Sequence, residues 1–191
     1  MLEEIGIAYE HVPVRPYTDS RSADYLRINP NGPNGHIPSL EDDGFILWES
    51  LAINLYLAER YAGAPLWPAN VQDRARTYQW SLWAANEIEL RIVSIGRGFS
   101  KKSPDQAAVA SGLEQLAAAF CVLEGQLDGR ACLLGEVFTV ADLNLASTIR
   151  EPGEQGVAGI AAIELTSFPK VARWLDHCGD RHANRRVVAL A

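Results

Sequence analysis

Apolar residues in the second half of the sequence recur with the period of an α-helix. Within residues 104–127 they return every third or fourth position and share one helical face, formed by Val109, Leu113, Leu116, Phe120, Leu123 and Leu127. Another long helix is expected over residues 71–94, and two more are expected to begin at Thr139 and at Phe168. Residues 71–191 are therefore predicted to form an all-helical domain.

The sequence before this region is made of shorter segments with mixed periods. LEEIG predicts the last turn of a helix that stops at Gly6, and a strand is expected from about Ala8 to Val12. A short helix is expected over Arg21–Asn29, and GAPLWPAN, with two prolines and a glycine, is typical of a linker. The chain is thus predicted to be α+β, with a first domain (1–62), a linker (63–70) and a helical domain (71–191).

The stretch HIPSLEDDGFILWES predicts a β-hairpin. Its strands are expected at Ile37–Glu41 and Phe45–Trp48, and the turn between them at Asp42-Asp43-Gly44, where the residue types tolerate positive φ. Helical periodicity then runs from Ser50 to Tyr61. The second strand is therefore expected to lead directly into a helix.

The two ends of this hairpin predict a binding site. A cis bond at Ile37-Pro38, after a glycine-rich loop, would turn the Ile37 amide and carbonyl outward, where they could pair with the main chain of a peptide. Glu49 and Ser50 stand at a helix start, where free N–H groups and the dipole attract a carboxylate. With the Ser50 hydroxyl as a further donor and Glu49 as a partner for an ammonium group, these residues predict a small zwitterionic peptide. Ser50 could instead serve as a helix cap alone.

Three motifs resemble the cytosolic glutathione transferases. NPNG followed by HIPSLEDDGFILWESLAINLYLAERY is similar to their glutathione-binding half, whose pattern is N-P-x-G, an aliphatic residue before a cis-proline, and E-S at a helix start. FTVADLNLAS resembles the capping box of their helical domain, with Thr139 and Asp142 three apart, and FPKVARWLDHCGDRHANRRV resembles their C-terminal helices. The resemblance covers nearly the whole chain and implies a thioredoxin-like domain followed by a helical domain.

The resemblance implies roles for five residues. Ile37 would pair with the cysteinyl main chain of glutathione, Pro38 would be the cis-proline, and Glu49 and Ser50 would hold the γ-glutamyl end. His36 would reach the glycyl carboxylate, although it could also be a loop residue without this role. The implied activity is that of a glutathione transferase, which adds the thiolate of glutathione, its co-substrate, to a small hydrophobic electrophile in detoxification.

Two departures from the family pattern bear on catalysis. The family's thiol-activating Ser, Tyr or Cys lies upstream of the segment that begins here at Leu2, so we expect this chain to lack the first strand of the thioredoxin-like domain and that residue. The catalytic residue is therefore left unknown, and neither Tyr9 nor Tyr17 is assigned the role. Gly32-Pro33-Asn34 also resembles an insertion in the loop, and it could displace His36.

Three functions are compatible with these motifs. The first is a transferase whose apolar pocket lies in the helical domain near Trp80, Trp83 and Arg91, although both tryptophans fit a core or dimer contact better. The second is a non-catalytic glutathione-binding or scaffold protein. The third is a glutathione-dependent reductase or isomerase, which would normally need a cysteine at the missing position. Family members are usually homodimers, and a homodimer is expected.

Composition excludes several other classes. The formal charge is -7, and no long run of Lys and Arg is present, so a nucleic-acid partner is not expected. The apolar stretches fall short of a membrane span, and the N-terminus lacks the basic start of a signal peptide, so the protein is expected in the cytoplasm. Four scattered histidines and the cysteines Cys121, Cys132 and Cys178 match no metal motif, so no metal is expected and the thiols are predicted to be buried and reduced.

Overall fold

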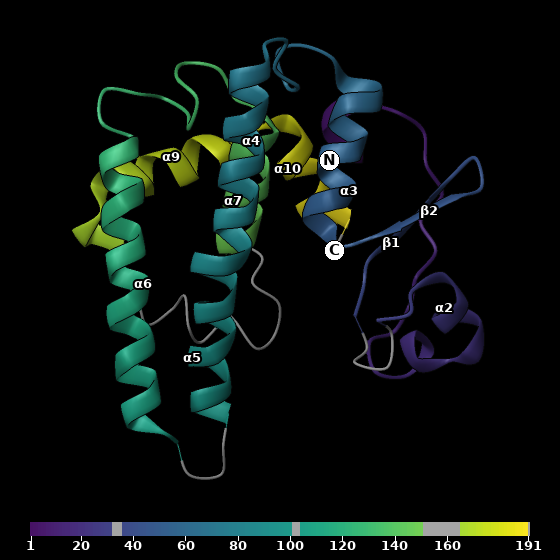
Figure 1. The fold of residues 1–191 in the computed structure, drawn as a ribbon, viewed down its shortest axis with the longest axis horizontal. Coiled ribbons are helices and arrows are strands. Elements are labelled where there is room, and N and C mark those ends of the chain that lie inside the picture. The colour runs from purple at the N-terminus through teal and green to yellow at the C-terminus, as the bar shows by residue number, and fades with distance from the viewer. Residues whose placement is uncertain (32–35, 101–103, 151–164, 191) are drawn as a thin grey trace. The chain divides into compact units, whose positions relative to one another are not determined.

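The structure, a computed structural model, describes residues 1–31, 36–100, 104–150 and 165–190. The chain divides into two compact units, unit 1 (Met1–Ala62) and unit 2 (Gly63–Ala191), which are described one at a time (Figure 1). The insertion predicted at 32–34 lies outside the described residues.

Unit 1 combines short helices with one β-hairpin. Its elements are α1 (Leu2–Ile5), the 3₁₀ turn η1 (Asp19–Arg21), α2 (Ala23–Ile28), β1 (Ser39–Asp42), β2 (Phe45–Trp48), α3 (Ser50–Leu57) and the π-helical turn η3 (Ala58–Ala62). Helix α1 ends, as predicted, at Gly6, which has the left-handed conformation common after a helix. Helix α2 begins two residues later than predicted because the Ser22 hydroxyl caps it, accepting the N–H of Tyr25 at 3.2 Å.

The hairpin has a regular antiparallel register. Ser39 pairs with Trp48 at its open end, and Asp42 pairs with Phe45 next to the turn. The turn is Asp43-Gly44, with φ of 53° and 81°. Positive φ at both central residues matches the twist of the flanking strands, so this sequence fixes a two-residue turn and with it the register.

Three predicted details of unit 1 were wrong. The first strand begins at Ser39 rather than Ile37, because Pro38 has no N–H with which to pair. The turn has two residues rather than three, because Asp42 belongs to the strand. The strand expected over Ala8–Val12 does not form, since no other segment among the described residues lies alongside to complete its hydrogen bonds.

The described part of unit 2 is built from helices. They are α4 (Val71–Trp83), the π-helical turn η4 (Ala84–Glu89), α5 (Leu90–Ser100), α6 (Gln106–Gln126), α7 (Val140–Arg150), the 3₁₀ turn η5 (Leu165–Ser167), α9 (Pro169–Gly179) and α10 (His182–Leu190). The prediction of a helical second domain is confirmed.

The first long helix of unit 2 extends further than predicted, through η4 and α5 rather than to about residue 94. Helices α5 and α6 run side by side (Figure 1). Glycines allow their close approach: a Cβ on Gly98 would lie 2.6 Å from Val109 Cγ2, and one on Gly112 would lie 2.7 Å from Ile95 Cγ1. Gly98 therefore serves helix contact here rather than helix termination.

The predicted apolar face of α6 forms part of the unit 2 core. Leu113 is half-buried, whereas the other members are buried: Val109, Leu116, Phe120, Leu123 and Leu127. By length and composition α6 could also cross a membrane, although the core helix of a soluble protein passes the same test. Burial of this face is what its helical period requires.

Asp142 is a buried side chain of this core that accepts four hydrogen bonds. Its Oδ2 accepts the N–H and the hydroxyl of Thr139 at 2.9 and 3.1 Å, so the predicted cap at the start of α7 forms. Its Oδ1 accepts the Leu133 N–H at 2.7 Å and the Trp174 Nε1–H at 3.0 Å. Burial raises the pKa of Asp142, and these hydrogen bonds oppose the rise by stabilising the carboxylate.

Candidate functional site

The segment before β1 exposes main-chain groups. The Ile37-Pro38 peptide bond is cis, as predicted, and Ile37 is 45% exposed. No hydrogen bond joins the Ile37 main chain to another residue within the described ranges. Its amide and carbonyl are therefore available to an incoming peptide main chain, which is the arrangement a strand-like ligand requires.

Two side chains of α2 hold this segment in place. The Tyr25 hydroxyl donates to the His36 carbonyl at 3.2 Å and lies 3.0 Å from the Ser39 Oγ. Asn29, which is 1% exposed, donates its Nδ2 to the same carbonyl at 3.4 Å. Sequence reasoning missed both residues, although Asn29 opens the NPNG motif and was therefore within reach of it.

Glu49 occupies the cap position of α3 in an unusual conformation. Its φ is 76° and its ψ is 109°, in the region that favours glycine. Strained residues of this kind concentrate at functional sites, where the surrounding structure holds them in place. The side chain is exposed, and its carboxylate has no hydrogen-bond or ion-pair partner among the residues that the structure describes.

Ser50 is the first residue of α3 and is also exposed. Its hydroxyl caps no helix, because Glu49 holds the cap position and no side-chain capping bond forms there. The start of α3 thus stands beside an accessible hydroxyl and an accessible carboxylate. Such a helix start attracts an anionic group, and Glu49 can bind a cationic group next to it.

The hairpin brings these two parts of the site together. Because Ser39 pairs with Trp48, Ile37-Pro38 and Glu49-Ser50 extend from the same open end of the hairpin. At the other end, Asp42 fastens the turn region to α3 and η3, accepting the hydroxyl of Tyr56 at 2.8 Å and that of Tyr61 at 2.7 Å. The hairpin is therefore held at its tip while its open end presents the candidate site.

The His36 side chain is exposed beside this open end. Its carbonyl faces Tyr25 and Asn29, whereas no described residue accepts from or donates to its imidazole. Across the described residues, no group of three or more His, Cys, Asp or Glu side chains could hold a metal ion.

Both parts of the chain match one family. Residues 1–59 match the description "Glutathione S-transferase, N-terminal domain", and residues 84–181 match "Glutathione S-transferase, C-terminal domain". The chain belongs to the glutathione S-transferase family.

Individual glutathione transferases resemble the whole chain. Glutathione S-transferase GstB of Escherichia coli strain K12 is 32% identical over 195 residues, covering 99% of this chain and 89% of that protein. Glutathione S-transferase 3 of Zea mays is 33% identical over 201 residues, covering 99% and 86%. A solved glutathione transferase from Burkholderia graminis, with two glutathione molecules bound per subunit, is 28% identical and has a TM-score of 0.83 over 97% of this chain and 79% of that one.

These likenesses confirm three predictions. The fold is that of a glutathione transferase, with a thioredoxin-like domain before a helical domain. The function is that of a glutathione transferase enzyme. Its co-substrate is glutathione.

Two tyrosines lie near the start of this glutathione transferase, and neither is assigned a role in thiol activation. Tyr9 donates to Glu3 Oε1 at 3.0 Å, and the Arg21 guanidinium lies over the Tyr17 ring at 5.3 Å from its centre. The catalytic residue of the transferase therefore stays unassigned.

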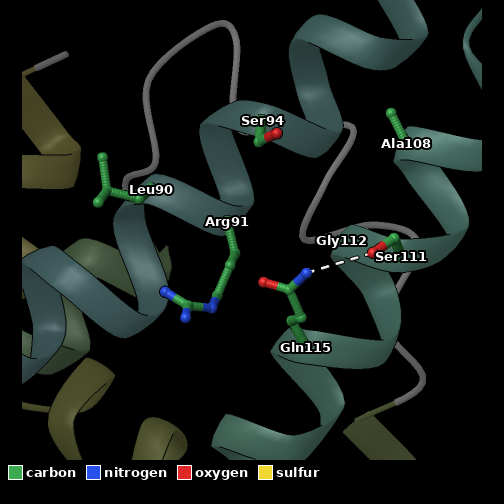
Figure 2. A pocket seen from close by; sticks show the side chains of 7 residues that line it. All are labelled: Leu90, Arg91, Ser94, Ala108, Ser111, Gly112 and Gln115. Carbon is green, nitrogen blue, oxygen red and sulfur yellow. Dashed lines mark hydrogen bonds between the residues drawn. The ribbon is translucent and has the colours of Figure 1, made fainter.

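The helical unit of the transferase carries a surface hollow of about 390 Å³ between α5 and α6 (Figure 2). Arg91, predicted to line an electrophile pocket, lies at its edge and pairs with Glu87 at 2.7 Å. Figure 2 shows the Arg91 guanidinium and the Gln115 amide on opposite sides of the hollow. Trp80 is buried and contacts Trp83 edge to face at 5.2 Å between ring centres, so the first tryptophan is a core residue.

Proposed function

We propose that the open end of the hairpin in unit 1 is the glutathione site. In this proposal the Ile37 main chain pairs with the cysteinyl main chain, Pro38 holds the adjoining cis bond, and Glu49 and Ser50 bind the γ-glutamyl end. His36, whose side chain is exposed beside the open end, binds the glycyl carboxylate in this proposal. One observation supports this most: the hairpin register brings together the Ile37 main chain, the Glu49 carboxylate and the start of α3, and neither of the first two groups has a partner among the described residues.

The chemistry of these groups matches the γ-glutamyl end. Its carboxylate can accept from the Ser50 hydroxyl at the start of α3, where the helix dipole adds to the attraction. Its ammonium can donate to Glu49. Hydrogen bonds with a charged partner contribute about 1.5–3 kcal/mol each, so two of them account for most of a micromolar to millimolar affinity.

The reaction we propose is conjugation of the glutathione thiolate to a small hydrophobic electrophile, in detoxification. A free thiol has a pKa of about 8.5, so at neutral pH only a small part is the nucleophilic thiolate. The enzyme's task is to increase that part and hold the sulfur near the electrophile.

We also propose that the transferase is a cytoplasmic homodimer with domains at 1–62 and 71–191 joined by a linker at 63–70. Helix α4 supports the dimer, because Val71, Tyr78 and Leu82 are exposed at helical spacing along one face. Covering such an apolar stripe with a second copy would remove it from water. Sedimentation equilibrium tests this, and a monomeric mass at micromolar concentration would contradict it.

Glutathione titration calorimetry tests the site. Glu49→Ala should weaken binding about tenfold or more and Ser50→Ala about threefold, because each removes a partner of a charged group. Glu59→Ala, which removes an exposed carboxylate from η3, is the matched control and should leave the affinity unchanged. Unchanged affinity in both site variants would show that glutathione binds elsewhere.

Turnover separates the possible functions. Conjugation of an aryl halide, followed by absorbance, is expected to exceed the uncatalysed rate. Binding without conjugation would identify a scaffold, and thiol-disulfide exchange faster than conjugation would identify a reductase.

A further inference from the structure

The Tyr25 hydroxyl lies between the two residues that flank Ile37-Pro38. It is 3.2 Å from the carbonyl oxygen of His36, just before that pair, and 3.0 Å from the hydroxyl oxygen of Ser39, just after it. Tyr25 is 9% exposed, and its main chain is fixed by the cap of α2. A rigid helical side chain thus bridges both sides of the segment that carries the exposed main chain of Ile37.

The direction of these hydrogen bonds follows from the donors available. A tyrosine hydroxyl has one proton, and a carbonyl can only accept, so Tyr25 donates to His36. The Tyr25 oxygen must then accept from Ser39, which settles the donor in the second bond. A chain of two bonds runs from Ser39 through Tyr25 to His36, and each bond polarises the next.

Peptide planarity carries this constraint to Ile37. The peptide between His36 and Ile37 is trans, so its C=O and N–H point in opposite directions. The C=O points toward the Tyr25 hydroxyl, and the Ile37 N–H therefore points away from α2. Asn29 supports the same carbonyl through a longer contact of 3.4 Å. The orientation of the Ile37 N–H is thus set largely by one phenolic hydroxyl.

We infer that Tyr25 is a positioning residue for substrate binding: its hydroxyl orients the peptide plane whose N–H receives the cysteinyl carbonyl of glutathione. This inference rests on the proposed function. Tyr25 touches no part of the ligand in this arrangement and acts through Ile37. Without the hydroxyl, the His36 carbonyl keeps the weaker Asn29 contact, and the plane gains freedom that ligand binding must remove.

Tyr25→Phe tests the inference, because it keeps the buried ring and removes the hydroxyl alone. Two ligands separate positioning from general damage: γ-glutamylcysteinamide has the cysteinyl carbonyl, whereas γ-glutamylcysteamine lacks it and keeps the γ-glutamyl end and the thiol. Tyr25→Phe should lower the affinity for γ-glutamylcysteinamide about fivefold, because one net hydrogen bond is lost. It should leave the affinity for γ-glutamylcysteamine within about 1.5-fold of the unmodified protein's value.

Tyr17→Phe is the matched control. It removes an exposed hydroxyl from the same unit, one that has no hydrogen-bond partner among the described residues, and it should change neither affinity. Ser39→Ala is a second variant that tests the inference, because it removes the donor that orients the Tyr25 hydroxyl. Ser39→Ala should also lower the affinity for γ-glutamylcysteinamide, by about twofold.

The outcomes are distinguishable. Failure of the unmodified protein to bind either ligand would defeat the proposed glutathione site itself. Binding by the unmodified protein, with equal losses for both ligands in Tyr25→Phe, would overturn the positioning role and leave the site intact. The same conclusion would follow if Tyr25→Phe bound both ligands normally. If Tyr25→Phe does not fold, as judged by circular dichroism, a normal affinity of Ser39→Ala for γ-glutamylcysteinamide would overturn the role.

Discussion

Replacing Asp142 by alanine should destabilise unit 2 more than any cap at its surface. The carboxylate is fully buried and accepts four hydrogen bonds from Leu133, Thr139 and Trp174. Those residues come from the segment before α7, the start of α7 and α9. Asp142→Ala therefore removes the one acceptor shared by three parts of the unit.

The size of the loss follows from the groups left behind. The N–H groups of Leu133 and Thr139 and the Nε1–H of Trp174 would stay buried without a partner, each at a cost of about 1–3 kcal/mol. Relief from burying a carboxylate offsets part of this cost, as the raised pKa of Asp142 indicates. We expect a net loss of roughly 3–5 kcal/mol, a large share of the 5–15 kcal/mol typical of a folded domain.

Urea unfolding followed by tryptophan fluorescence measures the loss. Asp105→Ala is the matched control, since Asp105 caps α6 at the surface, where it accepts the Ala108 N–H at 3.1 Å, and losing this cap should cost about 1 kcal/mol. The stability lost in Asp142→Asn should lie between the losses in Asp105→Ala and Asp142→Ala, because its amide NH₂ would face the Thr139 N–H. If Asp142→Ala lost no more stability than Asp105→Ala, the reasoning from buried donors would be refuted.

Two further predictions concern packing and thiols in unit 2. Gly112→Ala should lower the urea midpoint, because the new methyl would overlap buried Ile95 at a cost of about 1–3 kcal/mol, which exceeds the gain of about 1 kcal/mol in helix propensity. Gly125→Ala makes the same change where the space around the glycine is open, so it should raise the midpoint. In a thiol-reagent titration at pH 8, Cys121, which is exposed rather than buried as predicted, should react in the folded protein. The two buried thiols should react only after unfolding, because burial raises the pKa of Cys132 to about 12. Three rapidly reacting thiols would contradict this.

The helical unit was predictable because its signal is local. The apolar face of α6 repeats from Val109 to Leu127 within the predicted segment 104–127, and burial follows directly from such a period. Helix ends were less predictable where tertiary contact overrides a local signal. The first long helix of unit 2 was expected to end at about residue 94, but it runs on to Ser100, and α6 packs against it at Gly98. The strand expected at Ala8–Val12 failed for a related reason, since a strand depends on a neighbour that its own sequence does not reveal.

The candidate site was also predictable only in part, where its residues form a local sequence motif. Ile37-Pro38 and Glu49-Ser50 are two pairs of adjacent residues, and each pair forms a motif that could be proposed from residue types alone. Tyr25 could not, because its partners lie 11 and 14 residues away and the bond depends on how α2 meets the strand. A tyrosine on a short helix gives no sign of which carbonyl its hydroxyl will reach.

The register of the hairpin links the turn to the binding site. A two-stranded hairpin is marginal by itself, so side chains must hold it, as Asp42 does at the tip. A slip of one residue would turn alternate side chains to the opposite face and separate Ile37 from Glu49. The positive φ values of Asp43-Gly44 prevent that slip by fixing the pairing of Ser39 with Trp48. The geometry offered to a tripeptide at the open end is therefore set by two turn residues that never approach it.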